Sequence, residues 1–391
     1  MTARTRREAT SIYGIGAVTG YGWGSKLLWE GLVTGESAVR LTPGYSSHFD
    51  TDQIYVSRVP EGGNPSDGSS RYIRAMASVA REAIEDALSR GWRPGPVVGF
   101  IHATAIGEVD LWKDFYALHA GQGERSRKQY LELLPSTSAS NVMQEHGFHG
   151  PCMGVNAMCA SASSALLTAK MWLEAGVATD VVVVDSDISA TPEHVRNMHD
   201  LGVTIVDTDG PTSCRPFSPS SRGFNFGEAS VGFVVSRGTS SAYATVLGGA
   251  MTNDAYHVVS VAPDHLDIKR CVTTALADAG IGSADIAYLN AHATGTKQCD
   301  AAETDVLDSL LPRADAYGTK PMTGHCLGAS AAVELAIACM SYQDGMIPAP
   351  RAAVDAHPRL MDGPAARRPG PTLKLALGMG GHNGALVLDE P

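Results

Sequence analysis

The chain has 391 residues, of which 44% are hydrophobic and 18% charged, a balance typical of a compact globular protein rather than a disordered one. Its formal net charge of -11 argues against nucleic acid as a bulk partner, because phosphate binding needs a basic surface. Seven cysteines without a CxxC pair favour a reducing compartment over a disulfide framework. We find no apolar signal core and no apolar run of 18 residues, and therefore expect a cytoplasmic protein without a membrane segment.

Short apolar runs alternate along the chain with longer segments of helical periodicity, which predicts an α/β fold. Two helices stand out, at 76–91 and 161–176, and each ends at a glycine that can adopt the left-handed cap conformation. The predicted strands are 97–103, 181–185, 230–236, 286–290 and 373–377.

The first candidate for chemistry is Cys159, in the segment GVNAMCASASSALLTAKMWLEAG. It precedes the second predicted helix, so its sulfur faces unpaired backbone N–H groups and the positive end of the helix dipole. This placement predicts a lowered thiol pKa and a nucleophilic sulfur. A buried structural cysteine is the plain alternative, and the motif by itself does not exclude it.

Two histidines occupy similar turns. His292 follows a strand in YLNAHATGTKQCDAAETDVL, and two small hydroxyl residues, Thr294 and Thr296, come directly after it. His325 lies between a turn and an Ala-rich helix in YGTKPMTGHCLGASAAVELAIACM, five residues after Lys320. A histidine before a helix is biased toward the neutral imidazole, which donates one hydrogen bond. Each histidine alone is equally compatible with a structural role.

A glycine-rich turn lies near the C-terminus, in LALGMGGHNGALVL. Its glycines allow the backbone N–H groups around Met379 to approach a ligand closely.

The order of these motifs, Cys159, His292, His325 and then the glycine turn, resembles the β-ketoacyl synthases of the thiolase-like fold. Three further segments are similar to segments of that family, namely IYGIGAVTGYGWGSKLLWEGLVTGESAV, CRPFSPSSRGFNFGEASVGFVV and TNDAYHVVSVAPD. The turn NAHATGTKQCDAAET looks closest to ketosynthase subunits of type II polyketide systems. The resemblance covers most of the chain.

By this resemblance, Cys159 accepts an acyl group, and His292 and His325 bind a malonyl thioester that is decarboxylated for condensation. Lys320 supports them, with Glu303 as its carboxylate partner. Thr294 and Thr296 contact the phosphopantetheine arm. The backbone N–H groups of Cys159 and Met379 form the oxyanion hole.

The resemblance also implies a five-layered αβαβα fold of two similar halves, residues 1–240 with the cysteine and 241–391 with the histidines. The resemblance implies no metal and no redox cofactor. It implies that the substrates are thioesters bound to the phosphopantetheine of an acyl carrier protein. The expected assembly is a homodimer or a heterodimer with a chain-length-factor-like subunit.

The sequence departs from the family pattern near the site. Met158 replaces a small residue before the nucleophile, Ala293 replaces a glycine, and Leu377 and Met379 replace two phenylalanines, the second of which gates the cysteine. Ala229, Ser230 and His382 are further departures. Methionine is more adaptable in shape than phenylalanine, so acyl-chain selection is expected to differ.

Three alternatives remain. The fold also suits a non-catalytic chain-length-factor-like partner, although such partners usually lack the cysteine. Met158 and Met379 motivate an acyltransferase variant that never decarboxylates malonate. The segment GIGAVTG suggests an NAD-dependent oxidoreductase, but its glycines have the spacing GxGxxxG instead of the dinucleotide fingerprint GxGxxG.

Overall fold

The computed structural model describes residues 9–120, 127–206 and 213–391. Within these residues, no helix combines the length and apolar character that crossing a membrane requires. All five predicted strands and both predicted helices are present. The first helix, α2, begins five residues earlier than predicted because Ser70 caps it, with its hydroxyl accepting a hydrogen bond from the backbone N–H of Ile73.

The sheet consists of two halves with the same strand order. The N-terminal half has β1 (Thr10–Thr19), β8 (Ala229–Arg237), β7 (Asp180–Asp187), β5 (Val98–Ala103) and β6 (Cys152–Val155) side by side. The C-terminal half has β9 (Ala244–Asn253), β15 (His382–Asp389), β14 (Thr372–Gly378), β10 (Tyr288–Asn290) and β11 (Asp315–Tyr317). If the five strands of each half are numbered by their order along the chain, their order across the sheet is the same in both halves: first, fifth, fourth, second and third.

The two halves meet where β1 pairs with β9 in antiparallel register over three residue pairs. The division that we predict at residue 240 falls between the end of β8 and the start of β9, and we retain it as a proposal for the domain boundary. Short strands lie outside this plan: β2 (Gly22–Trp23) pairs with β1, β3 (Arg40–Thr42) with β4 (Ile54–Val56), and β12 (Met346–Ile347) with β13 (Ala365–Ala366).

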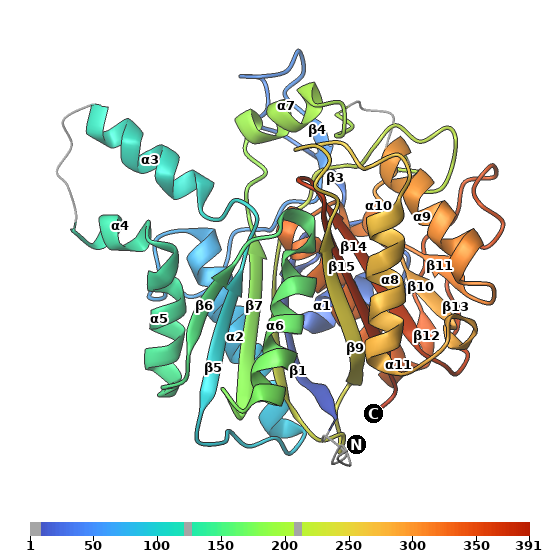
Figure 1. Cartoon of the computed structure of the whole chain (residues 1–391). Helices are drawn as coiled ribbons and strands as arrows, with labels where there is room; N and C mark the ends of the chain where they lie inside the picture. The colour runs from blue at the N-terminus through green and yellow to red at the C-terminus, as the bar shows by residue number, and fades with distance from the viewer. Residues whose placement is uncertain (1–8, 121–126, 207–212) are drawn as a thin grey trace.

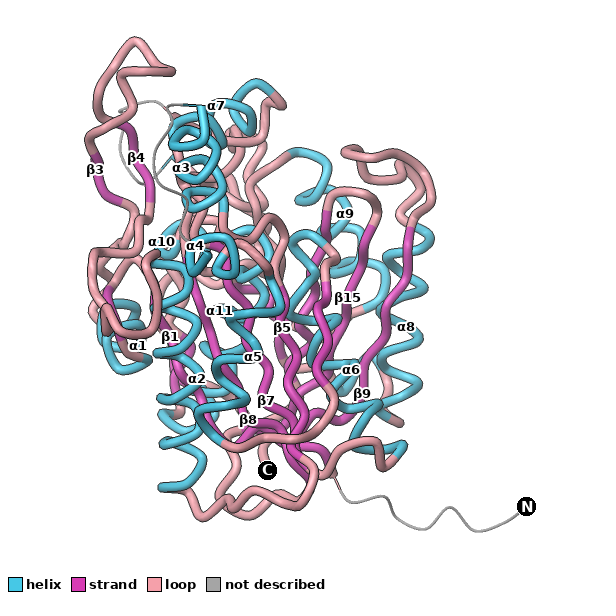
Figure 2. The backbone as a smooth tube through the Cα atoms, turned by 90° about the vertical axis from the view of Figure 1, so that its left-hand side faces the viewer, coloured by secondary structure: helices cyan, strands magenta, loops and turns pink. Residues whose placement is uncertain are grey.

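The sheets are covered by three helical layers (Figures 1 and 2). Helix α2 (Arg71–Ser89) packs on β1, β7 and β8, while α8 (Leu266–Ala279) packs on β9 and β15 at the opposite flank. Helices α6 (Ser161–Ala175) and α11 (Ser330–Asp344) lie between the halves, and each contacts strands of both. This arrangement confirms the predicted five-layered αβαβα fold of the thiolase-like kind.

Side-chain alternation along the strands explains the layers. On β7, Val181 and Val183 belong to the central core that contains α6 and α11, whereas Val182 and Val184 belong to the core under α2. Successive side chains of a strand point to opposite faces, so a strand that is apolar at every position must be covered on both sides.

The remaining helices surround this framework. Helix α7 and the β3–β4 hairpin lie together at the top of the molecule in Figure 1, and α3 extends away from the sheet. These helices are α1 (Ser25–Val33), α3 (Val109–Ala120), α4 (Arg127–Glu132), α5 (Pro135–His146), α7 (Pro192–Asp200), α9 (Lys297–Leu310) and α10 (Lys320–Thr323).

The side chain of Ala293, in the turn after β10, packs closely against Gly318, which follows β11. Ala293 has a left-handed φ of 50°, and a Cβ atom added to Gly318 would lie 2.2 Å from the Cβ of Ala293. Gly318 itself has no positive φ, so the extra atom meets a steric obstacle rather than backbone strain.

We expect Gly318→Ala to reduce the free energy of unfolding by about 1–3 kcal/mol, the usual cost of overpacking. Ala293→Gly removes the obstructing atom and relaxes the left-handed backbone, so the double variant should be more stable than Gly318→Ala alone. Urea denaturation of both single variants and the double variant measures this coupling. Additivity to within about 0.5 kcal/mol would show that the two residues do not clash.

Candidate active site

Cys159 lies in a short 3-10 turn (Met158–Ala160) that leads directly into α6. The turn is held by Ser161, whose hydroxyl accepts from the backbone N–H of Ala157 at 3.0 Å and donates to the carbonyl of Met158 at 2.6 Å. Met158 has a left-handed φ of 49°, an uncommon conformation for a non-glycine residue that recurs at functional sites. The cysteine lies at the start of the helix, as the sequence predicts, and its side chain is buried.

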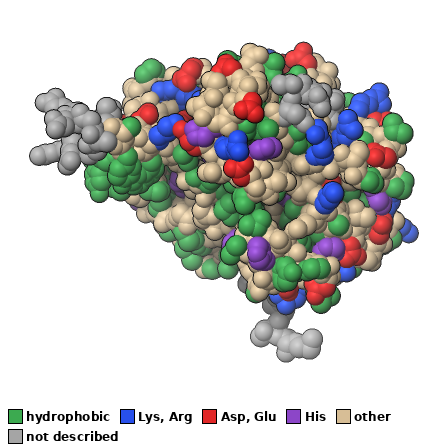
Figure 3. Space-filling model, turned by 90° about the horizontal axis from the view of Figure 1, so that it is seen from above, with side chains coloured by type: hydrophobic (Ala, Val, Ile, Leu, Met, Phe, Trp, Pro, Cys, Tyr) green, Lys and Arg blue, Asp and Glu red, His purple; other side chains and the backbone are tan. Residues whose placement is uncertain are grey.

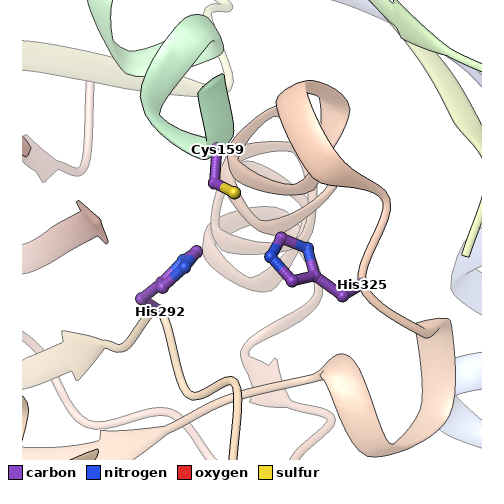
Figure 4. Close-up of side chains that lie close together, drawn as sticks. All are labelled: Cys159, His292 and His325. Atoms are coloured by element: carbon purple, nitrogen blue, oxygen red, sulfur yellow. The ribbon is translucent and has the colours of Figure 1, made fainter. Parts of the chain in front are cut away.

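The structure brings Cys159, His292 and His325 together from three separate segments of the chain. The cysteine sulfur and one ring nitrogen of each histidine all lie within 4.8 Å of one another. In the close-up, the three side chains point into a common space (Figure 4). The two imidazole rings are nearly perpendicular, at 85°, with centroids 5.3 Å apart.

His292 is oriented by Lys320. The ammonium nitrogen of Lys320 lies 3.4 Å from Nδ1 of His292 and also donates a hydrogen bond to the His292 carbonyl oxygen. A lysine ammonium group offers donors only, so Nδ1 must act as an acceptor. The ring proton of His292 is therefore on Nε2, the nitrogen on the other side of the ring.

His325 is held by its neighbour on α11. Its Nδ1 lies 2.6 Å from the hydroxyl oxygen of Ser330, and the ring of Phe224 packs edge-on against it with centroids 4.4 Å apart. Burial lowers the pKa of both histidines well below the ordinary value, and the positive charge of Lys320 lowers it further. Both imidazoles are thus neutral, as expected for His325.

Burial also governs the cysteine, and here the expectation of a lowered thiol pKa is wrong. Burial raises the pKa of Cys159 to about 12, although the Lys320 charge and the backbone N–H of Met379 act in the opposite direction. The helix start that was expected to stabilise a thiolate is itself buried, so the resting sulfur is a thiol.

The predicted pairing of Lys320 with Glu303 is also wrong. Lys320 forms its ion pair with Glu334 on α11, and the other oxygen of Glu334 lies 2.5 Å from Lys374 on β14. Glu303 instead accepts hydrogen bonds from the backbone N–H groups of His292 at 2.5 Å and Ala293 at 2.7 Å. It supports the turn that carries His292 and has no exposed surface with which to contact a substrate.

Glu334 and Lys374 are the residues that the sequence analysis missed, although a signal was present. Glu334 is the one charge in the run ASAAVELAIACM, and Lys374 interrupts the strand LKLAL. When the core covers an apolar helix or strand on all sides, a single charged residue within that element is buried too. A buried charge requires a partner of opposite sign.

A cavity of about 480 Å³ opens onto the cysteine. It is lined by all three residues of the cluster and by Thr294, Thr296 and Met379. The arm-binding and oxyanion roles of these last three residues stay predictions. The hydroxyl oxygens of Thr294 and Thr296 lie 2.9 Å apart.

The glycine turn approaches the cysteine closely. A Cβ atom on Gly378 would lie 2.6 Å from the carbonyl oxygen of Ala157 and 3.3 Å from the backbone nitrogen of Cys159. Only glycine allows this approach, which brings the Met379 backbone N–H to the sulfur. The side chains of Met379 and Met158 both pack against the apolar cluster that includes Val195 and Met198 of α7.

Comparison with known proteins identifies the same family, and its relatives cover nearly the whole chain. Residues 7–241 match the family model described as "Beta-ketoacyl synthase, N-terminal domain", and residues 243–353 match "Beta-ketoacyl synthase, C-terminal domain". The tetracenomycin polyketide synthase ketoacyl synthase alpha subunit of Streptomyces glaucescens is 29% identical, with 99% of this chain and 98% of the relative covered. The 3-oxoacyl-[acyl-carrier-protein] synthase 2 of Staphylococcus aureus (strain COL) is 26% identical, with 99% of each covered.

Solved structures share the fold. A type II PKS acyl-carrier protein in complex with its ketosynthase bound to the hexaketide contains a chain with a TM-score of 0.87 and 22% identity, over 99% of this chain and 100% of that one. The ketosynthase ApeO in complex with its chain length factor ApeC, from Xenorhabdus doucetiae, gives a TM-score of 0.85 and 22% identity over 100% of both chains. This chain belongs to the β-ketoacyl synthase family and is similar throughout to its type II polyketide and fatty-acid ketosynthases.

Proposed function

We propose that this protein is an active condensing enzyme, which accepts an acyl group on Cys159 and extends it by decarboxylative Claisen condensation with a malonyl thioester. The observation that carries the proposal is the cluster of one thiol and two neutral imidazoles within 4.8 Å. A chain-length-factor-like partner has no use for this cluster, so its presence favours catalysis.

The first step is acyl transfer. The sulfur of Cys159 attacks the carbonyl carbon of a carrier-bound thioester, and the bond from that carbon to the carrier sulfur breaks. The proton of the Cys159 thiol ends on the released phosphopantetheine thiol. The tetrahedral oxyanion formed on the way is stabilised by the backbone N–H groups of Cys159 and Met379.

The second step is condensation. The malonyl carboxylate leaves as CO₂, and its electron pair forms an enolate whose oxygen accepts hydrogen bonds from Nε2–H of His292 and of His325. The enolate carbon bonds to the acyl carbonyl carbon, the bond to the Cys159 sulfur breaks, and the sulfur takes up a proton from solvent. The product is a β-ketoacyl thioester.

The substrates, in this proposal, are delivered on the phosphopantetheine of an acyl carrier protein, and neither a metal nor a redox cofactor takes part. Thr294 and Thr296 would hold the arm by its amide groups. Arg222 and Lys297 line the cavity and are exposed, and basic side chains lie among acidic ones on the face seen from above (Figure 3). Such local positive charge suits a carrier protein despite the net charge of -11.

We propose a dimer as the working assembly, made of two copies or of this chain and a chain-length-factor-like subunit. Strand β6 supports this, because among the residues that the structure describes it pairs only with β5, at the edge of the sheet, and it exposes three of its four residues. All seven cysteines are free thiols, which fits a cytoplasmic setting.

A second candidate function is acyl transfer to another acceptor without decarboxylation. Met158 and Met379 favour it, since they replace the small and gating residues usual in the family, and Met379 lines the cavity at the cysteine. Incubation with acyl-carrier and ¹⁴C-malonyl-carrier proteins separates the two functions: acylation of Cys159 without release of labelled CO₂ identifies the acyltransferase.

His292→Ala and His325→Ala should each lower the rate of CO₂ release by roughly 10²–10³-fold, because each removes a donor to the enolate oxygen. Both variants should still acquire an acyl group at Cys159, as seen by intact-mass analysis. His149→Ala, a change at an exposed histidine outside the site, serves as the control and should retain full activity. Normal CO₂ release by either site variant would refute the enolate-binding role.

The raised pKa of Cys159 predicts how its alkylation depends on pH. With a pKa of about 12, the thiolate fraction rises roughly tenfold per pH unit from pH 7 to 10, whereas an ordinary thiol levels off above about pH 8.5. Iodoacetamide labelling followed by peptide mass spectrometry measures the rate at Cys159. Cys152→Ser, which removes an exposed thiol on β6, should leave this profile unchanged; a plateau below pH 8 contradicts the prediction.

A further inference from the structure

The catalytic cluster is also the arrangement of a metal site. Among the residues that the structure describes, Cys159, His292 and His325 form the one group of three or more Cys, His, Asp or Glu side chains close enough to bind an ion. The ligand atoms around a tetrahedral zinc ion lie about 3.3–3.6 Å apart, so separations of up to 4.8 Å need only small side-chain shifts. One thiolate and two imidazoles, with a fourth position open to the cavity, is a ligand set that Zn²⁺ accepts readily.

Capture of a metal there would block acylation, because the sulfur could no longer attack a thioester. Lys320 opposes this capture in two ways. Its ammonium group lies 3.4 Å from Nδ1 of His292, so a divalent cation on the other nitrogen of that ring would meet a positive charge nearby. Lys320 shares its carboxylate partner, Glu334, with Lys374. Its hydrogen bond also keeps the ring proton on Nε2, where a metal would need a free lone pair.

No acidic residue in the described part of the chain faces the cluster from the cavity to offset the repulsion between the Lys320 ammonium group and a bound cation. No Asp or Glu is among the described residues that line the cavity, and the basic Arg222 and Lys297 are. The oxygens of Glu334 bind Lys320 and Lys374, and those of Glu303 accept backbone N–H groups. The cluster therefore lacks the carboxylate that would favour a cation.

We propose that Lys320, placed against His292, protects the Cys159–His292–His325 cluster from divalent metals of the zinc class. Without this ammonium group the three side chains bind such a cation. Binding replaces the thiol proton of Cys159 by the metal and releases that proton to solvent. This role of Lys320 holds whichever acyl-transfer reaction the site performs.

The test compares metal binding by the full-length chain and its Lys320→Met variant in the absence of substrate. Zn²⁺ is titrated by calorimetry, and Co²⁺ by its absorption, since a thiolate ligand to Co²⁺ gives a near-ultraviolet charge-transfer band. Lys320→Met should bind both ions about 10–100-fold more tightly than the parent chain, the range by which partners of ligating histidines alter metal affinity. Only the variant should show the thiolate band.

Three further variants make the result specific. Cys159→Ser in the Lys320→Met background should abolish the band, whereas Cys299→Ser, which removes another thiol lining the cavity, should leave it. Lys320→Arg keeps the charge and should behave like the parent chain. Glu334 retains Lys374 as a partner when Lys320 is replaced, and Lys320→Gln is the second neutral variant if Lys320→Met does not fold.

Equal affinity of the parent chain and a folded neutral variant would overturn the proposal, and so would a thiolate band in the parent chain. These measurements need no substrate. They can therefore refute the role of Lys320 while the condensing activity is confirmed, or support that role while the condensing activity is refuted.

Discussion

The active site depends on one buried carboxylate, that of Glu334, which binds two lysines. Lys320 reaches from Glu334 to His292. Lys374 binds Glu334 and donates to the carbonyl oxygens of Ala291, just after β10, and of Leu375 within β14. Removing one member of such a buried pair leaves an uncompensated charge and typically costs about 3–5 kcal/mol. The charge network thus ties the histidine to the end of β10 and to β14.

The repeated strand order explains why the site lies where it does. Cys159 comes from the N-terminal half and the two histidines from the C-terminal half, and the halves meet through β1, β9 and the central helices. Asp187 reinforces this junction, since it accepts backbone N–H groups from Ala105 at 2.8 Å and from Gly328, just before α11, at 2.9 Å. A site divided between two halves needs such cross-connections to hold its geometry to a fraction of an ångström.

Backbone strain and burial are concentrated around the reactive groups. Met158, Ala293 and Leu327, each within two residues of a member of the cluster, adopt left-handed conformations that cost non-glycine residues energy. Burial keeps both imidazoles neutral and the sulfur protonated. In the proposed mechanism, the exclusion of water that raises the thiol pKa would also strengthen each hydrogen bond to the developing oxyanion.

The sequence by itself determined the family, the α/β layers, and the three residues that form the cluster, because strand alternation, helix caps and motif order are local properties of the chain. Only the tertiary structure decided which carboxylate Lys320 meets and what protonation state Cys159 has. Glu303 and Glu334 both lie on helices of the C-terminal half. No rule of sequence spacing tells which of the two accepts backbone N–H groups and which pairs with Lys320. The thiol pKa likewise follows from how deeply the folded chain buries the sulfur, a quantity that exists only once both halves have closed around it.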